Sequence, residues 1–221
     1  VTTATEHTYL MAVVALRTCH ATTTARIWAY LNNSPKSVWR TRLIDQCRLL
    51  GINVVDWQNP FSLSKIFNAG QDSTHGEYIV YGTSDVIFYA GWMDTIVRHW
   101  QENPSFFCLC NYSFDDLNMP CVKHDVKPEH KIWQTHNPSS GLIVFKRSSN
   151  YRGDENFTLW EIDADLLYYL ERNGLKAGCC LDARCDHLID MVKSQGNFGS
   201  EAISCPTEYL RKKWNLAPPK E

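Results

Sequence analysis

Short apolar runs alternate with amphipathic segments along the first half of the chain, and this alternation constrains the fold more than any other feature. Residues 9–16 and 52–57 form apolar runs of the length of buried strands. Between them, apolar residues in 25–31 and 41–50 recur at helical spacing, and Gly51 ends the second of these segments. Because parallel neighbouring strands need long crossovers, strands joined through helices predict an α/β fold with a mostly parallel central sheet.

The same alternation of strand and helix patterns continues to about residue 110 and returns later in the chain. Further helices are expected at 63–69, 92–100 and 163–173, and further strands at 77–81, 106–110, 142–145 and 177–181. Residues 111–140 show almost no periodicity, and loops of this length in compact domains are usually functional. We therefore expect one domain over residues 1–215, with residues 216–221 as a C-terminal tail or the start of a linker to further domains.

Composition excludes several classes of protein. Hydrophobic residues make up 44% of the chain and charged residues 21%, which does not fit a disordered chain. A net charge of −2 provides no basic field for nucleic-acid binding, and no apolar run approaches the roughly 20 residues of a membrane span. The nine cysteines are odd in number and follow no zinc-finger spacing, so we expect them to be mostly reduced and the protein to be cytoplasmic. A zinc cluster of Cys179, Cys180, Cys185 and His187 is the alternative, although adjacent cysteines chelate poorly.

Asp85 is the first candidate site residue. It follows the expected strand 77–81, at the end of the sequence Gly82-Thr83-Ser84-Asp85. Ligands of open α/β sheets bind outside the carboxyl ends of the strands, which favours a functional carboxylate here. The alternative is a turn aspartate that only caps the next segment.

The segment around Asp85 resembles the metal-binding segment of glycosyltransferases of the GT-A fold, above all the large GT2-like group. The sequence FNAGQDSTHGEYIVYGTSDVIFYAGWMDTIV has that family's order of an Asn and Gly in a short helix, a strand, a D-x-D motif and a Trp-containing helix. The D-x-D motif is incomplete, because Thr83 stands in place of the first aspartate. The resemblance covers residues 61–187 and implies a single Rossmann-like GT-A domain. It also implies transfer of a sugar from a nucleoside-diphosphate sugar, with a UDP-sugar as the leading donor, to a glycan or other hydroxyl acceptor.

By this resemblance a Mn²⁺ or Mg²⁺ ion would bind at Asp85, with His187 as a second ligand. Oxygen ligands such as aspartate suit both ions. A cation that bridges the donor phosphates stabilises the charge on the leaving nucleoside diphosphate. An ordinary surface or core histidine is the other interpretation of His187.

A second block, YRGDENFTLWEIDADLLYYLERNGLKAGC, resembles the stretch that supplies the base in inverting GT-A enzymes. By that resemblance Asp163 would take the proton of the acceptor hydroxyl, and Asp154 and Glu155 would support the acceptor. One alternative is that acidic residues gather here because the start of a helix favours them. Two further alternatives are a retaining enzyme, in which Asp163 only binds the acceptor, and a catalytically inactive carbohydrate- or nucleotide-binding module.

The resemblance also places residues at the donor and the acceptor. The loop after the first expected strand and the end of the second would face the nucleotide, since both border the same crevice. The expected donor-binding residues are Leu16, Arg17, Thr18, Asp56, Asn68, Ser84 and Asp85. Trp133, in the aperiodic segment, is expected to stack on the acceptor sugar.

Overall fold

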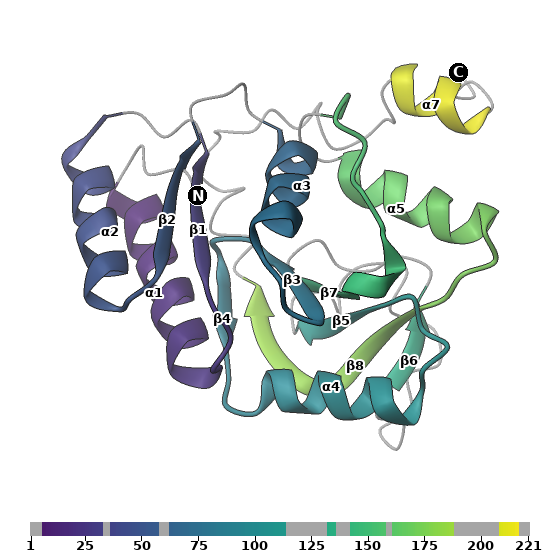
Figure 1. Ribbon diagram of the computed structural model, residues 1–221, viewed down its shortest axis with the longest axis horizontal. Coiled ribbons are helices and arrows are strands. Elements are labelled where there is room, and N and C mark those ends of the chain that lie inside the picture. Colours follow the sequence, from purple (N-terminus) through teal and green to yellow (C-terminus); the bar gives the residue numbers. More distant parts are fainter. Residues whose placement is uncertain are drawn as a thin grey trace.

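The computed structural model describes residues 6–32, 36–57, 62–113, 132–135, 142–157, 161–187 and 208–216 (Figure 1). Its helices are α1 (Glu6–Thr22), α2 (Val38–Leu49), α3 (Leu63–Ser73), α4 (Trp92–Glu102), the short 3₁₀ helix η2 (Arg147–Ser149), α5 (Glu161–Arg172) and α7 (Glu208–Trp214). Its strands are β1 (Trp28–Asn32), β2 (Asn53–Trp57), β3 (Tyr78–Gly82), β4 (Val86–Phe88), β5 (Cys108–Ser113), β6 (Ile132–Thr135), β7 (Leu142–Lys146) and β8 (Ala177–His187).

The strands form two sheets within these described residues. β1 and β2 pair in parallel, while the larger sheet has the order β3-β7-β5-β8-β4, with β6 also paired to β8. In the larger sheet β5 and β8 run parallel, and the other pairs are antiparallel. The α/β class is confirmed, but the prediction of a mostly parallel sheet is wrong. Strand direction depends on pairing between distant segments, which local periodicity does not encode.

Helices cover both faces of the larger sheet (Figure 1). The alternation of side chains along β7 defines the two cores. Leu142 and Val144 pack in the cluster that contains the buried face of α4, and Ile143 and Phe145 pack in the cluster that contains residues of α3 and α5. A third cluster lies among α1, α2, β1 and β2. No helix in the described part of the chain is long and apolar enough to cross a membrane.

The first two elements are the reverse of those predicted. Residues 9–16, expected as a strand, lie in α1, and residues 25–31, expected as a helix, contain most of β1. In α1 the side chains that pack inward, among them Ala12, Ala15 and Cys19, recur at helical spacing. In β1 Ala29 and Leu31 are buried and alternate with half-buried neighbours, as strand geometry requires. A short apolar run fits either structure, and only the long-range partners decide between them.

The other predicted helices and strands are confirmed to within a few residues, except that β8 continues well beyond residue 181, to His187. Part of the aperiodic segment 111–140 is strand, since β5 ends at Ser113 and β6 occupies 132–135. The rest of that segment lies outside the described residues. Helix α7 was not predicted.

Candidate active site

Asp85 lies in the turn that joins β3 to β4. Gly82 ends β3 and Val86 begins β4, so the turn consists of Thr83, Ser84 and Asp85. The hydroxyl of Thr83 donates a hydrogen bond to the Asp85 carboxylate, with 2.5 Å between Oγ1 and Oδ1. The residue that replaces the first aspartate of the D-x-D motif therefore orients the second one.

His187 is the last residue of β8 and lies on the strand next to β4. The two strands run antiparallel, and His187 pairs with Val86, the residue that directly follows Asp85. Paired residues on antiparallel strands have Cα atoms about 5 Å apart. The sequence prediction placed His187 after a strand, whereas the structure places it within one and brings its backbone close to the Asp85 turn.

Asp85 and His187 fit the metal ion that the resemblance implies. An aspartate oxygen and an imidazole nitrogen are both suitable ligands for Mn²⁺, and Mg²⁺ is commonly held by one or two carboxylates together with substrate phosphates and water. Within the described residues, no three His, Cys, Asp or Glu side chains converge on a metal site.

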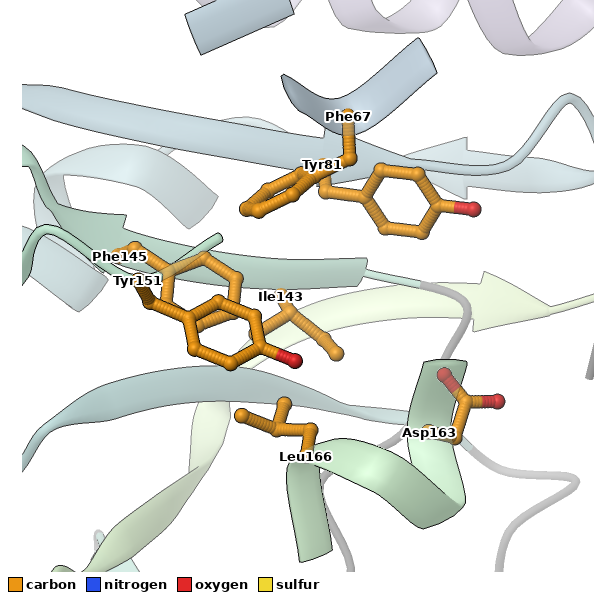
Figure 2. Close-up of a pocket in the computed structure, with 7 residues that line it drawn as sticks. All are labelled: Phe67, Tyr81, Ile143, Phe145, Tyr151, Asp163 and Leu166. Atoms are coloured by element: carbon orange, nitrogen blue, oxygen red, sulfur yellow. The ribbon is translucent and has the colours of Figure 1, made fainter. Parts of the chain in front are cut away.

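Asp163 lies in the first turn of α5 and lines a small pocket (Figure 2). The other lining residues are Phe67, Tyr81, Ile143, Phe145, Tyr151 and Leu166. The pocket has space for about one water molecule. Its lining is largely apolar, and Asp163 is the one charged residue among these seven side chains. The helix N-terminus stabilises a negative charge at this position.

Tyr81 on β3 connects the two acidic residues. Burial raises the pKa of Tyr81, and the negative charges of Asp163 and Asp85 raise it further. Tyr81 also lines the same pocket as Asp163 and lies four residues before Asp85 in the chain. The structure thus brings the β3 end of the Asp85 segment to the pocket that Asp163 lines. Sequence analysis missed Tyr81, because an aromatic residue in a strand is usually a core residue.

Asn68 on α3 is a buried anchor for the segment that follows β7. Its side-chain amide donates hydrogen bonds to the carbonyl of Gly153 and to the carboxylate of Glu155, and its oxygen accepts one from the Gly153 N–H, each at 2.9 Å. Gln71 on the same helix donates to the carbonyl of Tyr151 at 2.8 Å. These contacts from Asn68 and Gln71 fix α3 of the first block against the Tyr151–Glu155 segment of the second. The predicted role of Asn68 in donor binding stays a prediction.

Asp154 and Glu155 lie on this anchored segment. The Asp154 carboxylate accepts hydrogen bonds from Lys213 at 2.8 Å and from Tyr209 at 3.0 Å, both on α7. Burial acts to raise the pKa of Asp154, but the hydrogen bonds from Lys213, Asn156 and Tyr209 outweigh it and lower the pKa to about 2. Asp154 therefore holds α7 in place, and its proposed contact with an acceptor stays a prediction.

Lys213 connects this segment to α5 as well. Its ammonium lies 2.7 Å from the buried carboxylate of Asp165, which also accepts a hydrogen bond from the Trp214 indole at 2.8 Å. Helix α7 is therefore tied to the first turns of α5, close in sequence to Asp163. Sequence analysis missed Lys213, because nothing in a short basic helix indicates which carboxylates it will meet.

Three expected donor-binding residues do not lie in the loop where the sequence predicted them. Leu16, Arg17 and Thr18 were expected in a loop after the first strand, but they lie inside α1. Leu16 packs in the third core cluster, and Arg17 donates a hydrogen bond to Gln46 on α2 at 2.5 Å. Thr18 donates to the carbonyl of Val14 and accepts from the N–H of Phe88. All three hold α1 against its neighbours.

Asp56 and Trp133 both lie on strands. Asp56 is near the carboxyl end of β2, where it pairs with Leu31 in the register and forms an ion pair with Arg40 of α2. Trp133 lies on β6, opposite Cys179 of β8, rather than in a loop. Their predicted contacts with donor and acceptor stay predictions.

Known proteins resemble this chain in fold rather than in sequence. No protein-family model matches it, and no curated protein matches it in sequence. Among the solved structures that match is GalNAc-T7 with UDP, GalNAc and Mn²⁺, at a TM-score of 0.63 and 13% identity, over 78% of this chain and 39% of that one. Another is the mannosyltransferase PcManGT from Pyrobaculum calidifontis in complex with GDP-Man and Mn²⁺, at a TM-score of 0.60 and 13% identity, over 93% of this chain and 64% of that one.

This chain therefore spans less than two thirds of the length of either neighbour. At 13% identity the likeness shows the fold alone. That fold is the GT-A fold of nucleotide-sugar glycosyltransferases, as the sequence predicted.

Proposed function

We propose that this chain is a metal-dependent glycosyltransferase, which moves a sugar from a nucleoside-diphosphate sugar to the hydroxyl of a glycan or other acceptor. The observation that carries the proposal is that Tyr81 on β3, four residues before Asp85, lines the same pocket as Asp163. Asp85 follows a strand of the larger sheet, and Asp163 lies in the first turn of a helix packed on it. The fold shared with two transferases solved with UDP or GDP-Man and Mn²⁺ supports the same proposal.

In the proposed reaction Asp163 is the general base. Its carboxylate accepts the proton of the acceptor hydroxyl while that oxygen attacks the anomeric carbon of the donor. The bond from the anomeric carbon to the phosphate oxygen breaks, the nucleoside diphosphate leaves, and the product has the inverted configuration. A positioned base of this kind contributes about 10²- to 10⁴-fold to the rate.

In the same proposal Asp85 binds the divalent cation, with His187 as the second protein ligand. When bound, the cation neutralises charge on the departing diphosphate. The hydroxyl of Thr83 donates to one oxygen of the Asp85 carboxylate and holds it in the turn. Thr83 thus supplies orientation, but not the negative charge of the missing aspartate.

We place the nucleotide at the carboxyl ends of β1 and β2, in line with the rule for open α/β sheets. These ends lie side by side, because Asn32 pairs with Trp57 and Leu31 pairs with Asp56. This placement retains Asp56 as a donor-binding residue. The donor-binding roles predicted for Leu16, Arg17 and Thr18 stay predictions, although these residues lie in α1 and not in a loop.

The experiment is donor turnover in Mn²⁺ with a panel of UDP-, GDP- and dTDP-sugars, followed by the anomeric configuration of the product by NMR. Asp163→Asn should lower kcat by about 10²- to 10⁴-fold and leave donor affinity unchanged. A product with retained configuration, or a variant with nearly normal kcat and a raised acceptor KM, would contradict the role of Asp163 as an inverting base and favour the retaining alternative.

A binding module without catalysis is the second candidate, and Thr83 is the observation that favours it. The D-x-D position that should carry a carboxylate here carries a hydroxyl, already hydrogen-bonded to Asp85. A module of this kind would bind nucleotide or sugar in calorimetry and release no nucleoside diphosphate with any donor of the panel. Turnover with one donor is enough to exclude it.

A further inference from the structure

The ring of Tyr151 is held rigidly beside the Asp163 pocket. It is 5% exposed and stacks on Phe145, with 5.3 Å between ring centroids and 10° between planes. Phe67, Phe107 and Tyr169 also contact it, at centroid distances of 5.9, 6.0 and 5.2 Å. Gln71 fixes the backbone of Tyr151 as well. The phenol hydroxyl therefore has one defined position.

That hydroxyl is buried, and no described side chain or backbone group forms a hydrogen bond with it. Figure 2 shows the Tyr151 hydroxyl pointing into the pocket, on the side where Asp163 lies. Buried polar groups in proteins almost always have a partner, which is either protein or ordered water. A fixed, buried hydroxyl aimed into a cavity is therefore evidence for a ligand in that cavity.

The size of the pocket and the polar groups of three lining residues favour water as the ligand. The cavity holds about one water molecule, and a buried water needs two to four polar partners. Three lining residues carry polar groups, namely Tyr151, Tyr81 and Asp163. The charge of Asp163 also contributes, after burial and other neighbours, to the raised pKa of Tyr151, which is consistent with their proximity.

We propose that this pocket binds one ordered water molecule, which links the hydroxyl of Tyr151 to the carboxylate of Asp163. The Tyr151 hydroxyl donates a hydrogen bond to the water, and the water donates one to an oxygen of Asp163. This bridge holds one carboxylate oxygen towards the pocket. Tyr151 is then a positioning residue for Asp163, a role that rests on the proposed function, whereas the water site does not.

The first test uses the unaltered chain and needs no activity. A crystal structure at a resolution that shows ordered water should contain one peak in the pocket, within about 3.2 Å of the Tyr151 hydroxyl and of one Asp163 oxygen. A pocket without that peak, or a Tyr151 hydroxyl bonded directly to a protein group, would overturn the proposal.

The second test compares Tyr151→Phe with Tyr169→Phe. Both remove one hydroxyl from the same aromatic cluster, but Tyr169 does not line the pocket. The ¹³C carboxyl signal of Asp163, assigned with Asp163→Asn, should shift in Tyr151→Phe and stay in place in Tyr169→Phe. An unchanged signal in Tyr151→Phe, or equal shifts in both variants, would contradict the water bridge.

Kinetics then test the positioning role. Tyr151→Phe should lower kcat by about tenfold, the effect of one hydrogen bond, with the donor KM unchanged and Tyr169→Phe at the wild-type rate. Unchanged kcat in Tyr151→Phe would overturn that role. If no donor is turned over by the unaltered chain, the proposed function fails, while the electron density and the carboxyl signal still decide whether the water site exists.

Discussion

Removal of the Asn68 side chain should destabilise the fold strongly, although asparagine is a polar residue. Asn68 is 4% exposed, and its amide makes three hydrogen bonds of 2.9 Å to Gly153 and Glu155. Asn68→Ala removes all three and leaves the N–H and the carbonyl of Gly153 without these partners. At about 1 kcal/mol for each lost hydrogen bond, and 1–3 kcal/mol for a buried group left unsatisfied, we expect the free energy of unfolding to fall by about 3–5 kcal/mol.

Urea unfolding followed by tryptophan fluorescence measures this loss as a lower midpoint with an unchanged slope. Asn53→Ala is the matched control, because Asn53 is exposed and its amide makes one long hydrogen bond of 3.4 Å to the carbonyl of Ile27. The control should change stability by less than about 0.5 kcal/mol. A loss below about 1 kcal/mol in Asn68→Ala would refute the claim that this amide anchors the segment after β7.

Two other predictions concern the segment after β7 and the helices α3 and α7 that contact it. The pKa of Asp154 in the folded protein, about 2, lies below its usual value, so its contribution to stability is complete above about pH 5 and is lost as the pH falls towards 2. Lys213→Met should raise that pKa and flatten the acid dependence of the thermal midpoint between pH 5 and 2; an unchanged acid profile would show that Lys213 does not set it. A Cβ at Gly153 would lie 3.1 Å from Cβ of Ser64, so Gly153→Ala should destabilise by about 1–3 kcal/mol. A Cβ at Gly70, in a helix, would meet nothing closer than 3.9 Å, so Gly70→Ala should stabilise by up to about 1 kcal/mol, and equal midpoints for the two variants would contradict both expectations.

The sequence predicted those parts of the fold that local patterns determine. The amphipathic stripe and Gly51 identified α2, and the aromatic and apolar runs identified β2, β3 and β7. The apolar run in α1 could not be assigned, because its residues suit a helix or a strand and its partners in α2, β2 and β4 are distant in sequence. The antiparallel pairing of β3 with β7 could not be predicted for the same reason, since it joins residues sixty or more positions apart.

The candidate site was predictable where it consists of acidic residues at the ends of elements. Asp85 follows β3 and Asp163 lies in the first turn of α5, and both positions are visible from strand and helix signals. Tyr81 and Tyr151 were not identified, because their role depends on where their hydroxyls point and not on their place in a pattern. The contact of α7 with Asp154 and Asp165 was not predicted either, because it joins segments that are far apart in the chain.

Release of nucleoside diphosphate from a donor sugar tests the central claim most directly. With Mn²⁺ present, the unaltered chain should release the nucleoside diphosphate from at least one UDP-, GDP- or dTDP-sugar. Release should stop on addition of a chelator, and Asp85→Asn should lower it sharply while circular dichroism and the thermal midpoint stay unchanged. No release from any donor of the panel, or equal release by the wild type and Asp85→Asn, would contradict a metal-dependent glycosyltransferase built around Asp85.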